Sequence, residues 1–555
     1  MVGSSAHRAV ALRLLSTLVA AIAVDAAASG TRKLLQSSTT IRGRAIVVHQ
    51  EFVGGVSGKF LALRTDNGVN VQLANAVVDD ASTGQMAEAT GTWCQQNNGQ
   101  GNAFGKFKTE STTVSGNPKT DTVTTTAYAE PPELADVTVG TSSGATATSA
   151  TLRDATLNVT AFSGAMVTSP LFQPVVSTLF VLTAASRALL PGIRSHLVPE
   201  QGRVVTAVTA ELERLNIYPT VVTVGSMFQR CTFGGTKLNT SNSAVTAVTT
   251  LPCSGTSSEG AWTFSRCEFA DMDGTAEAAE AKLRAQGINV DAYFYRVFML
   301  PPGLCAGMVG TGYVGCDGSW PCRAWVGHDF WTSPMTIAHE LGHNLYLSHS
   351  GSALSGQWDE YDDESCAMGY CCSYCCLNAP KAWQLGWNPV KELGSTAMKP
   401  GTTVSTSLFS QSLAIAAAAL RVKVSYWVGG EASVYVSYRK RHNTTNHPDA
   451  YLPASVADQL VIHTSNVAQP FDPAVSRSRR PGPPPPPLGA VGEAWTHPNA
   501  ATGLVIRRVP CNLTNRAQVH VCRKGGPETA ATCAFNIDND CNGLSGPEDP
   551  ACALI

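Results

Sequence analysis

Residues 336–349 read TIAHELGHNLYLSH. Ser333 and Pro334 stand directly before this stretch, and a serine cap followed by proline in the first turn is typical of a helix N-terminus. On a helix that begins at Pro334, His339 and His343 are four residues apart and leave the same face one turn from each other. The stretch therefore predicts a helix that presents two imidazoles side by side.

Two neutral imidazoles at this spacing suit zinc, and Glu340, beside the first of them, is placed to take a proton from a zinc-activated water. His349 follows His339 by ten residues, so the chain must turn after Leu345 to bring it back as a third ligand. Three protein ligands with an open fourth position are typical of a catalytic zinc site. The alternative, that these histidines are incidental, is disfavoured because the third histidine makes coincidence rarer. Imidazole sites also bind copper tightly, so the pattern leaves the native metal open.

The chain has 555 residues, enough for two to four domains. Charged residues make up only 14% of it and the formal net charge is −2, with no long basic block. Because binding to a phosphate backbone relies on clustered lysine and arginine, nucleic acid is excluded as a partner. We expect a monomer.

The first thirty residues indicate export. Arg8 and Arg13 precede the apolar run Leu14–Val24, and small residues follow it, a pattern typical of a signal peptide that we assign to residues 1–28. About eleven apolar residues are too few to span a bilayer, and no later stretch is long enough, so no stable membrane insertion is expected. The predicted location is secreted, in an extracellular matrix, cell wall or periplasmic space.

Sequons and cysteines agree with export. The chain has seventeen cysteines, which are dense from Cys231 to Cys376 and again from Cys511 to Cys552, and this favours disulfides over a thiolate metal cluster. Four Asn-x-Ser/Thr sequons predict glycosylation at Asn158, Asn239, Asn443 and Asn512.

Composition and secondary-structure patterns divide the chain after residue 28 into four regions. Residues 29–174 are β-rich, with a hairpin predicted around Asp66-Asn67-Gly68. Residues 175–395 alternate strands and helices, including a helix at Thr275–Gln286 that Gly287 would stop. Residues 396–525 predict a β-sandwich-like domain with a proline-rich insertion, including a hairpin of strands 422–428 and 434–438.

The cysteine-rich tail, residues 526–555, nearly repeats a calcium-loop spacing. Asp538, Asp540, Asn542 and Asp549 place oxygen side chains around Gly543, and oxygen ligands suit a hard cation. The alternative is a polar turn held by disulfides, because no flanking helices are evident. The sequence leaves both open, with calcium as a second candidate cofactor.

Several motifs resemble the gametolysin family of algal extracellular-matrix proteases, within the metzincin zinc endopeptidases. They are the following stretches: His339–His349, Ser365–Tyr370, Asn378–Pro380, Trp383–Trp387, Leu251–Cys253 and Cys322–Trp325. The resemblance covers about residues 175–440. It implies an α+β fold: a metzincin-like catalytic domain, with a mixed twisted sheet and an active-site helix, flanked by a β-rich propeptide and a β-rich C-terminal domain.

The implied function is a secreted zinc endopeptidase that hydrolyses hydroxyproline-rich wall glycoproteins. Met368 resembles the Met-turn methionine beneath the metal, and Tyr370 stands where some metzincins have a tyrosine that contacts the metal or the tetrahedral intermediate; for both, ordinary packing is the alternative. Tyr346 departs from the pattern, since metzincins usually have glycine at this turn. A tyrosine with positive φ costs on the order of 1 kcal/mol.

Cys94 is the only cysteine before Cys231, and it lies in the region that the resemblance assigns to a propeptide. Its thiol is a candidate cysteine switch that occupies the open zinc position; the alternative is an unpaired bystander. The competing hypothesis for the whole chain is a wall-binding or adhesive glycoprotein whose zincin domain no longer cuts, but an intact Glu340 argues against it.

Overall fold

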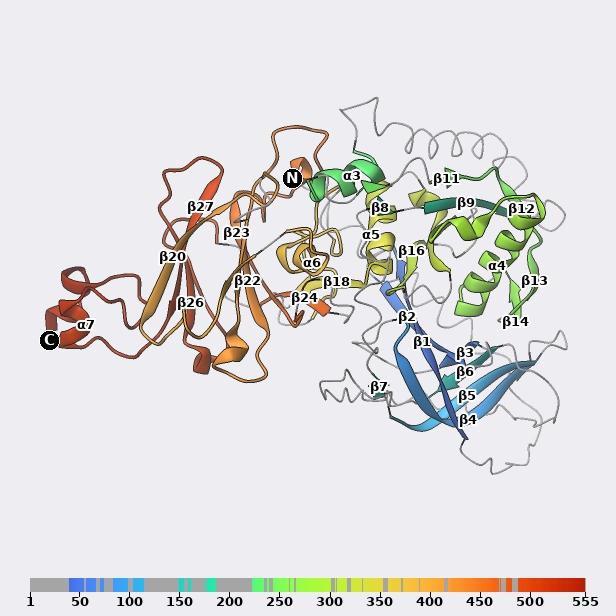
Figure 1. Ribbon diagram of the computed structural model, residues 1–555, viewed down its shortest axis with the longest axis horizontal. Coiled ribbons are helices and arrows are strands. Elements are labelled where there is room, and N and C mark those ends of the chain that lie inside the picture. The colour runs from blue at the N-terminus through green and yellow to red at the C-terminus, as the bar shows by residue number, and fades with distance from the viewer. Residues whose placement is uncertain are drawn as a thin grey trace, which may run out of the picture. The chain divides into compact units, whose positions relative to one another are not determined.

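The computed structural model describes residues 39–554 with gaps, the longest of which are 114–148, 161–174 and 186–221 (Figure 1). The predicted signal peptide, residues 1–28, lies outside the described residues, as does most of the proline-rich insertion. Among the helices that the structure describes, none is long and apolar enough to cross a membrane. Few helices and several sheets agree with the α+β class.

A 13-stranded sheet joins the N-terminal and central regions. The N-terminal strands are β1 (Thr39–Phe52), β2 (Val56–Thr65), β3 (Asn70–Leu73), β4 (Met86–Asn97), β5 (Ala103–Thr113), β6 (Ser149–Arg153) and β7 (Asn158–Thr160). The central strands are β9 (Thr178–Ala185), β11 (Ala244–Val245), β12 (Thr249–Leu251), β15 (Tyr295–Met299), β16 (Met308–Tyr313) and β17 (Cys322–Val326). The order runs β11-β9-β15-β17-β16-β1-β2-β3-β6-β5-β4-β7, with β12 beside β9.

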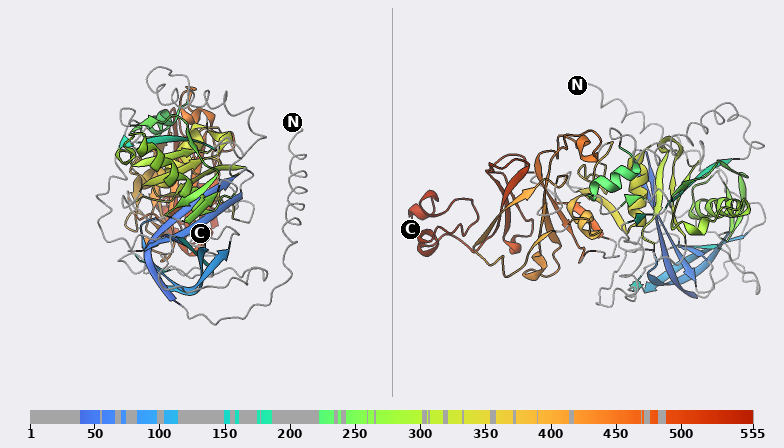
Figure 2. Two further views of the ribbon diagram at one scale, coloured as in Figure 1. Left: turned by 90° about the vertical axis from the view of Figure 1, so that its right-hand side faces the viewer. Right: turned by 45° about the horizontal axis from the view of Figure 1, so that its top comes forward.

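The junction between the two halves of this sheet is the pairing of β1 with β16. β1 is the long dark-blue strand in Figures 1 and 2, and it pairs antiparallel with β16 from Val48↔Tyr313 to Phe52↔Met308. β2 and β3 form the predicted hairpin, with Leu61 opposite Leu73. The sequence boundary at residue 174 therefore does not separate two sheets.

Five α-helices are described: α3 (Val224–Cys231), α4 (Phe269–Ala285), α5 (Pro334–Asn344), α6 (Ala379–Gln384) and α7 (Ala530–Ala534). α4 ends at Ala285, one residue before the predicted end, and Gly287 follows the C-cap residue Gln286 with φ +85°. It begins six residues before the predicted start, because Glu268 and Asp271 form a reciprocal capping box there. The 3-10 helices are η7 (Val290–Ala292), η8 (His328–Phe330), η9 (Val424–Tyr426), η10 (Pro448–Tyr451), η11 (Ala500–Thr502), η12 (Gly546–Glu548) and η13 (Cys552–Leu554).

The C-terminal region contains two sheets. The first is β18 (Leu347–Ser352), β24 (Ser476–Arg480), β23 (Gln459–Ser465), β22 (Ser433–Arg439), β21 (Ala419–Val422) and β19 (Lys391–Leu393), in that order. The second is β20 (Thr402–Phe409), β27 (Arg516–Arg523), β26 (Leu504–Val509) and β25 (Ala494–Thr496). Buried side chains of both, such as Ile462 and Val521, share one core, which is the arrangement of a sandwich.

Two details of this region differ from the sequence prediction. The predicted strand 422–428 ends at Val422, since Val424–Tyr426 forms η9, although β21 and β22 do pair antiparallel. The first sheet also begins with β18, inside the predicted protease region, so the boundary at residue 395 cuts through a sheet.

The shorter pairings and the disulfides complete the description. β8 (Val175–Val176) pairs with β10 (Lys237–Leu238), and β13 (Ser254–Ser257) pairs with β14 (Gly260–Thr263). The disulfides are Cys231–Cys376, Cys267–Cys305, Cys316–Cys322, Cys522–Cys541 and Cys533–Cys552. Disulfides of this number are typical of an oxidising compartment.

Candidate metal centre

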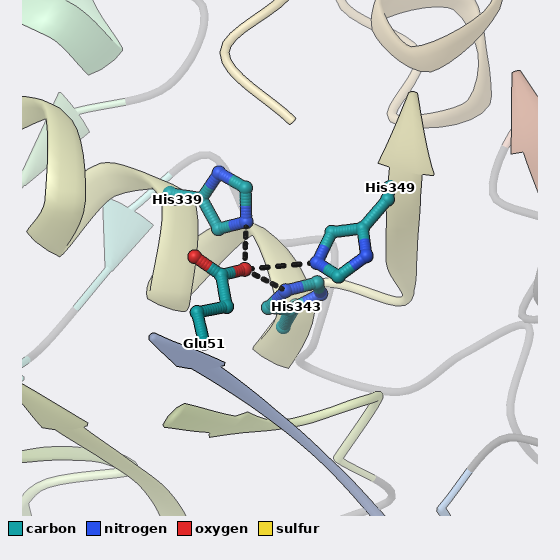
Figure 3. A group of neighbouring side chains, drawn as sticks. All are labelled: Glu51, His339, His343 and His349. Carbon is teal, nitrogen blue, oxygen red and sulfur yellow. Dashed lines mark hydrogen bonds and ion pairs between the residues drawn. The ribbon is translucent and has the colours of Figure 1, made fainter. Parts of the chain in front are cut away.

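Helix α5 begins as the sequence predicts. The Ser333 side chain accepts a hydrogen bond from the amide of Thr336, and Pro334 occupies the first position. The helix ends at Asn344, and the backbone turns at Leu345. His339 and His343 therefore leave one face of α5 and point toward the same space (Figure 3).

Tyr346 makes the turn that leads to the third histidine. Its φ is +68°, the left-handed conformation for which glycine is expected. The tyrosine ring is fully buried and lies so close to Gly315 that a Cβ there would collide with it. Burying an aromatic ring contributes about 1.5–3 kcal/mol, which offsets the conformational cost. The turn keeps its geometry, and β18 then carries His349 back to the other two histidines.

All three imidazoles are fixed through their Nδ1 atoms. The partner atoms are the Ala367 carbonyl for His339 at 2.7 Å, the Leu347 carbonyl for His343 at 2.7 Å, and the Glu360 carboxylate for His349 at 2.9 Å. Holding Nδ1 in this way orients the ring and leaves Nε2 for a metal, as in many metal sites. The sequence reasoning missed Glu360.

A fourth side chain, Glu51 of β1, completes the group. Its Oε1 lies 2.6 Å from His339 Nε2, 3.3 Å from His343 Nε2 and 2.8 Å from His349 Nε2 (Figure 3). These four buried residues could hold a metal ion, since their ligand atoms all lie within 4.8 Å of one another. Three nitrogens and a carboxylate oxygen are ligands that zinc takes. Glu51 was not predicted from the sequence. The available signal was a charged residue that directly continues an apolar strand.

Glu340 lies on the side of this group that faces β16. It is fully buried, and neither carboxylate oxygen has a hydrogen-bond partner among the described residues. Gly310 of β16 permits this position, because any Cβ there would collide with the Glu340 carboxylate. A buried carboxylate without a partner is costly, so Glu340 is suited to a group or a water molecule that enters the site.

Met368 and Tyr370 follow the histidines in the chain and differ in exposure. Met368 is fully buried, and its sulfur would lie 2.5 Å from a Cβ at Gly342 of α5. Tyr370 is 79% exposed. It lines a cavity of about 480 Å³ together with His339, Glu51 and Tyr361. The ring of Tyr361 lies 4.2 Å from that of His349.

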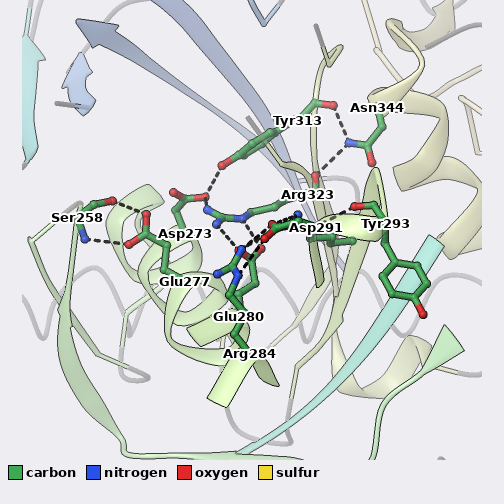
Figure 4. Close-up of polar contacts among 11 residues, drawn as sticks. Ser258, Asp273, Glu277, Glu280, Arg284, Asp291, Tyr293, Tyr313, Arg323 and Asn344 are labelled. Carbon is green, nitrogen blue, oxygen red and sulfur yellow. Dashed lines mark hydrogen bonds and ion pairs between the residues drawn. The ribbon is translucent and has the colours of Figure 1, made fainter. Parts of the chain in front are cut away.

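Asn344, the last residue of α5, ties the helix to the sheet. Its Nδ2 donates to the carbonyls of Tyr313 in β16 and Arg323 in β17, both at 3.0 Å (Figure 4). The Arg323 guanidinium in turn pairs with Asp273 at 2.6 Å and with Glu280 at 3.1 Å, both on α4. This buried network fixes α5 against β16, and it therefore fixes the histidines against the strand that pairs with β1.

The electrostatics of the group follow from burial and proximity. Burial lowers the pKa of His343 to about 3, which keeps this imidazole neutral as a metal ligand must be. Burial would also raise the pKa of Glu51, but the three imidazoles lower it well below its usual value. Burial, with the Glu51 carboxylate, raises the pKa of Glu340 well above its usual value.

Comparison with known proteins agrees with this geometry. Residues 210–479 match the family model of the gametolysin peptidase M11. These residues belong to the gametolysin family. The matched range contains all three histidines and Glu340, and it extends through the first C-terminal sheet to β24, but it excludes Glu51.

A curated relative is the autolysin of Chlamydomonas reinhardtii, which is 26% identical over 292 residues. The alignment covers 46% of this chain and 44% of the relative, so the chain spans less than half the length of that protein. The gametolysin match makes this part of the chain a peptidase domain, and the buried Glu/His₃ group agrees with a metallopeptidase.

Other predicted residues lie elsewhere. Cys94 belongs to β4, where its backbone pairs with Lys106 of β5; its side chain lies outside the described residues. Cys366 is a buried free thiol next to the Met368 turn, and burial raises its pKa to about 12. The cysteine switch stays a prediction.

The predicted calcium ligands gather in the tail. Asn542 Nδ2 donates to Asp540 at 3.2 Å and to Asp549 at 2.9 Å, and Asp538 accepts from the Gly543 amide at 3.0 Å. The sequence missed Glu528, whose carboxylate lies near those of Asp538 and Asp540. Calcium binding also stays a prediction.

The predicted glycosylation sites have different surroundings. Asn443 and Asn512 are exposed, whereas the side chains of Asn158 and Asn239 lie outside the described residues. Glycosylation is untested at all four.

Proposed function

We propose that the chain is a secreted zinc-dependent endopeptidase that hydrolyses wall and matrix glycoproteins rich in hydroxyproline. The observation that carries the proposal is the convergence of three Nε2 atoms, each fixed through Nδ1, beside a buried Glu340 with two unpaired oxygens. The family match and the autolysin relative support the proposed substrate class.

His339, His343 and His349 would hold the metal, and zinc bound there would supply Lewis-acid chemistry to a substrate carbonyl. Glu340 would accept the proton of the attacking water and return it to the leaving amine as the peptide bond breaks. Tyr370, exposed at the cavity, would donate a hydrogen bond to the oxyanion, and Met368 would form an apolar floor beneath the metal.

The peptide would bind as an added strand along β16, because extended peptides commonly pair with a free sheet edge. β16 is close to Glu340 at Gly310 and Gly312, so a strand there would bring its carbonyls to the catalytic glutamate. In the described chain β1 occupies this edge.

The test uses a full-length chain with a recognition site for a specific protease placed within residues 161–174. The chain is cut after folding, the N-terminal fragment is removed, and digestion of gelatin and of wall glycoprotein is followed with and without a chelator. We expect chelator-sensitive digestion of both. No digestion by cut, zinc-loaded protein would contradict the proposal and favour the adhesive glycoprotein.

Glu340→Ala should lower the digestion rate of the cut chain by about 10²- to 10⁴-fold, because it removes the proton acceptor. Its zinc content should stay unchanged, because the three histidines remain. Glu548→Ala, at an exposed position of the tail, is the matched control. Digestion by Glu340→Ala at the control rate would refute the role of Glu340.

A further inference from the structure

We propose that the N-terminal segment holds this protease inactive by a carboxylate: Glu51 is the fourth ligand of the metal site, and β1 covers the strand to which substrate binds. The inference rests on the proposed function and names how the same site is regulated. It has two independent supports, the position of one side chain and the pairing of one strand.

The first support is that the Glu51 carboxylate faces all three ligand nitrogens. Oε1 is within 3.3 Å of each Nε2, and Glu51 is only 8% exposed. Glu51 and His343 are 292 residues apart in the sequence, so their contact does not arise from a local sequence motif. Zinc sites with four protein ligands are closed, whereas catalytic sites keep one position open. Glu51 therefore converts an open three-histidine site into a closed one.

The second support is that the same strand covers β16. The register places Glu51 opposite Gly310 and His49 opposite Gly312, the two glycines that face Glu340. Backbone bonds continue past both ends of the ladder, from the Val314 amide to the Val47 carbonyl at 2.8 Å and from the Val53 amide to the Gly307 carbonyl at 2.7 Å. A substrate peptide cannot pair with β16 while β1 is there.

The alternation of a strand links the two supports. Residues 49 and 51 of β1 point to the same face because side chains alternate. The ring of His49 lies 4.9 Å from that of His343 and 4.8 Å from that of His349. The β1 segment thus fills the open position of the metal site, packs against two of the ligand histidines and occupies the edge of β16. Its departure would open the metal site and the substrate edge together.

The register also separates Glu51 from the cysteine predicted for this role. β4 pairs with β1 only from Thr39↔Gly91 to Arg44↔Met86. Cys94 therefore lies beyond the Thr39 end of β1, while Glu51 lies near the other end. Thr39 and Glu51 are twelve positions apart, which corresponds to about 40 Å of extended strand.

Cobalt in place of zinc gives a test that does not depend on proteolysis, because its visible spectrum reports the ligand set. Azide is the probe for an open position. The uncut wild-type chain should show no spectral change with azide, whereas uncut Glu51→Gln should bind azide. Glu51→Gln should also lose zinc to a chromogenic chelator at least about 10-fold more readily. Glu88→Gln, on β4 opposite Arg42, is the matched control and should match wild type.

Identical cobalt spectra and azide responses in Glu51→Gln and wild type would overturn the inference. The cut wild-type chain covers the case in which the variant does not fold: removal of the N-terminal fragment should create the azide response, and its absence would also overturn the inference. Azide binding by uncut Glu51→Gln, without digestion of any protein by the cut chain, would support the assignment of Glu51 and contradict the proposed function.

Discussion

The N-terminal segment and the C-terminal sandwich each add a strand beside the three histidines, but with opposite consequences. β1 pairs with β16 and points a carboxylate into the space between the imidazoles. β24 pairs in parallel with β18, the strand that carries His349, and makes its side-chain contacts around Ser350. One strand competes for the groups that the reaction needs, and the other holds one of those groups in place.

The C-terminal contact is a buried polar network. The Asp363 carboxylate accepts hydrogen bonds from Ser350 at 2.6 Å, from Asn378 at 2.9 Å and from His463 of β23 at 3.0 Å. Asn378 Nδ2 also donates to Ser478 Oγ of β24 at 2.7 Å. Because Ser350 follows His349, this network holds the strand that carries the third ligand. The family match ends at residue 479, within β24, so it includes this support and excludes the blocking strand.

The largest expected effect comes from removing β1. The cut chain, freed of its N-terminal fragment, should digest gelatin at least about 100-fold faster than the uncut chain, because the metal position and the edge of β16 open together. Uncut Glu51→Gln should fall between them, since β1 still covers the edge. Rates measured on the same zinc-loaded preparation, with zinc content determined for each, would check this order. Equal digestion rates for the cut and uncut chains would show that β1 does not block the site.

A smaller effect is expected from breaking the C-terminal support. Asp363→Asn should lower the free energy of unfolding by about 3–5 kcal/mol at pH 7, as expected for a buried pair that loses one charge. Burial alone would raise the pKa of Asp363, but His463 and Arg480, with the Ser350 hydroxyl, lower it below its usual value of about 4.

The sign of the pH dependence follows. The stabilisation by Asp363 is fully present above about pH 4 and is lost as the pH falls toward the lowered pKa of the folded state. Denaturant unfolding at pH 7 and pH 3 should therefore show a smaller difference between wild type and Asp363→Asn at pH 3. Asp458→Asn is the control, because Asp458 is exposed and its φ of +62° suits asparagine. An equal difference at both pH values would contradict the role of Asp363.

Local pattern explains what the sequence could predict. Eleven residues, 333–343, contain the cap at Ser333, the first turn at Pro334 and the spacing of His339 and His343. Helix geometry then predicts where these side chains lie. The end of α4 just before Gly287 and the hairpin of β2 and β3 are equally local. Tyr346 was the exception, because its ring is accommodated by Gly315, which is distant in sequence.

The rest of the site depends on contacts between distant segments. Glu51 reaches the histidines through the register of β1 on β16, and Glu360 reaches His349 through a turn without a characteristic motif. The one signal for Glu51 was the run His49-Gln50-Glu51, polar residues that continue the apolar strand Ala45–Val48. All three are buried, and polar residues at buried strand positions need partners.

The smallest expected effect separates the two candidate switches. Cys94→Ser in the uncut chain should leave the cobalt spectrum, the lack of response to azide and the digestion rate unchanged, because the pairing of β4 with β1 ends three residues before Cys94 and near Thr39, far along the strand from Glu51. Glu51→Gln in the same background should change all three measurements. If Cys94→Ser opened the site to azide and Glu51→Gln did not, the thiol would be the ligand that keeps the precursor latent. The β1 strand would then cover the substrate edge without closing the metal site.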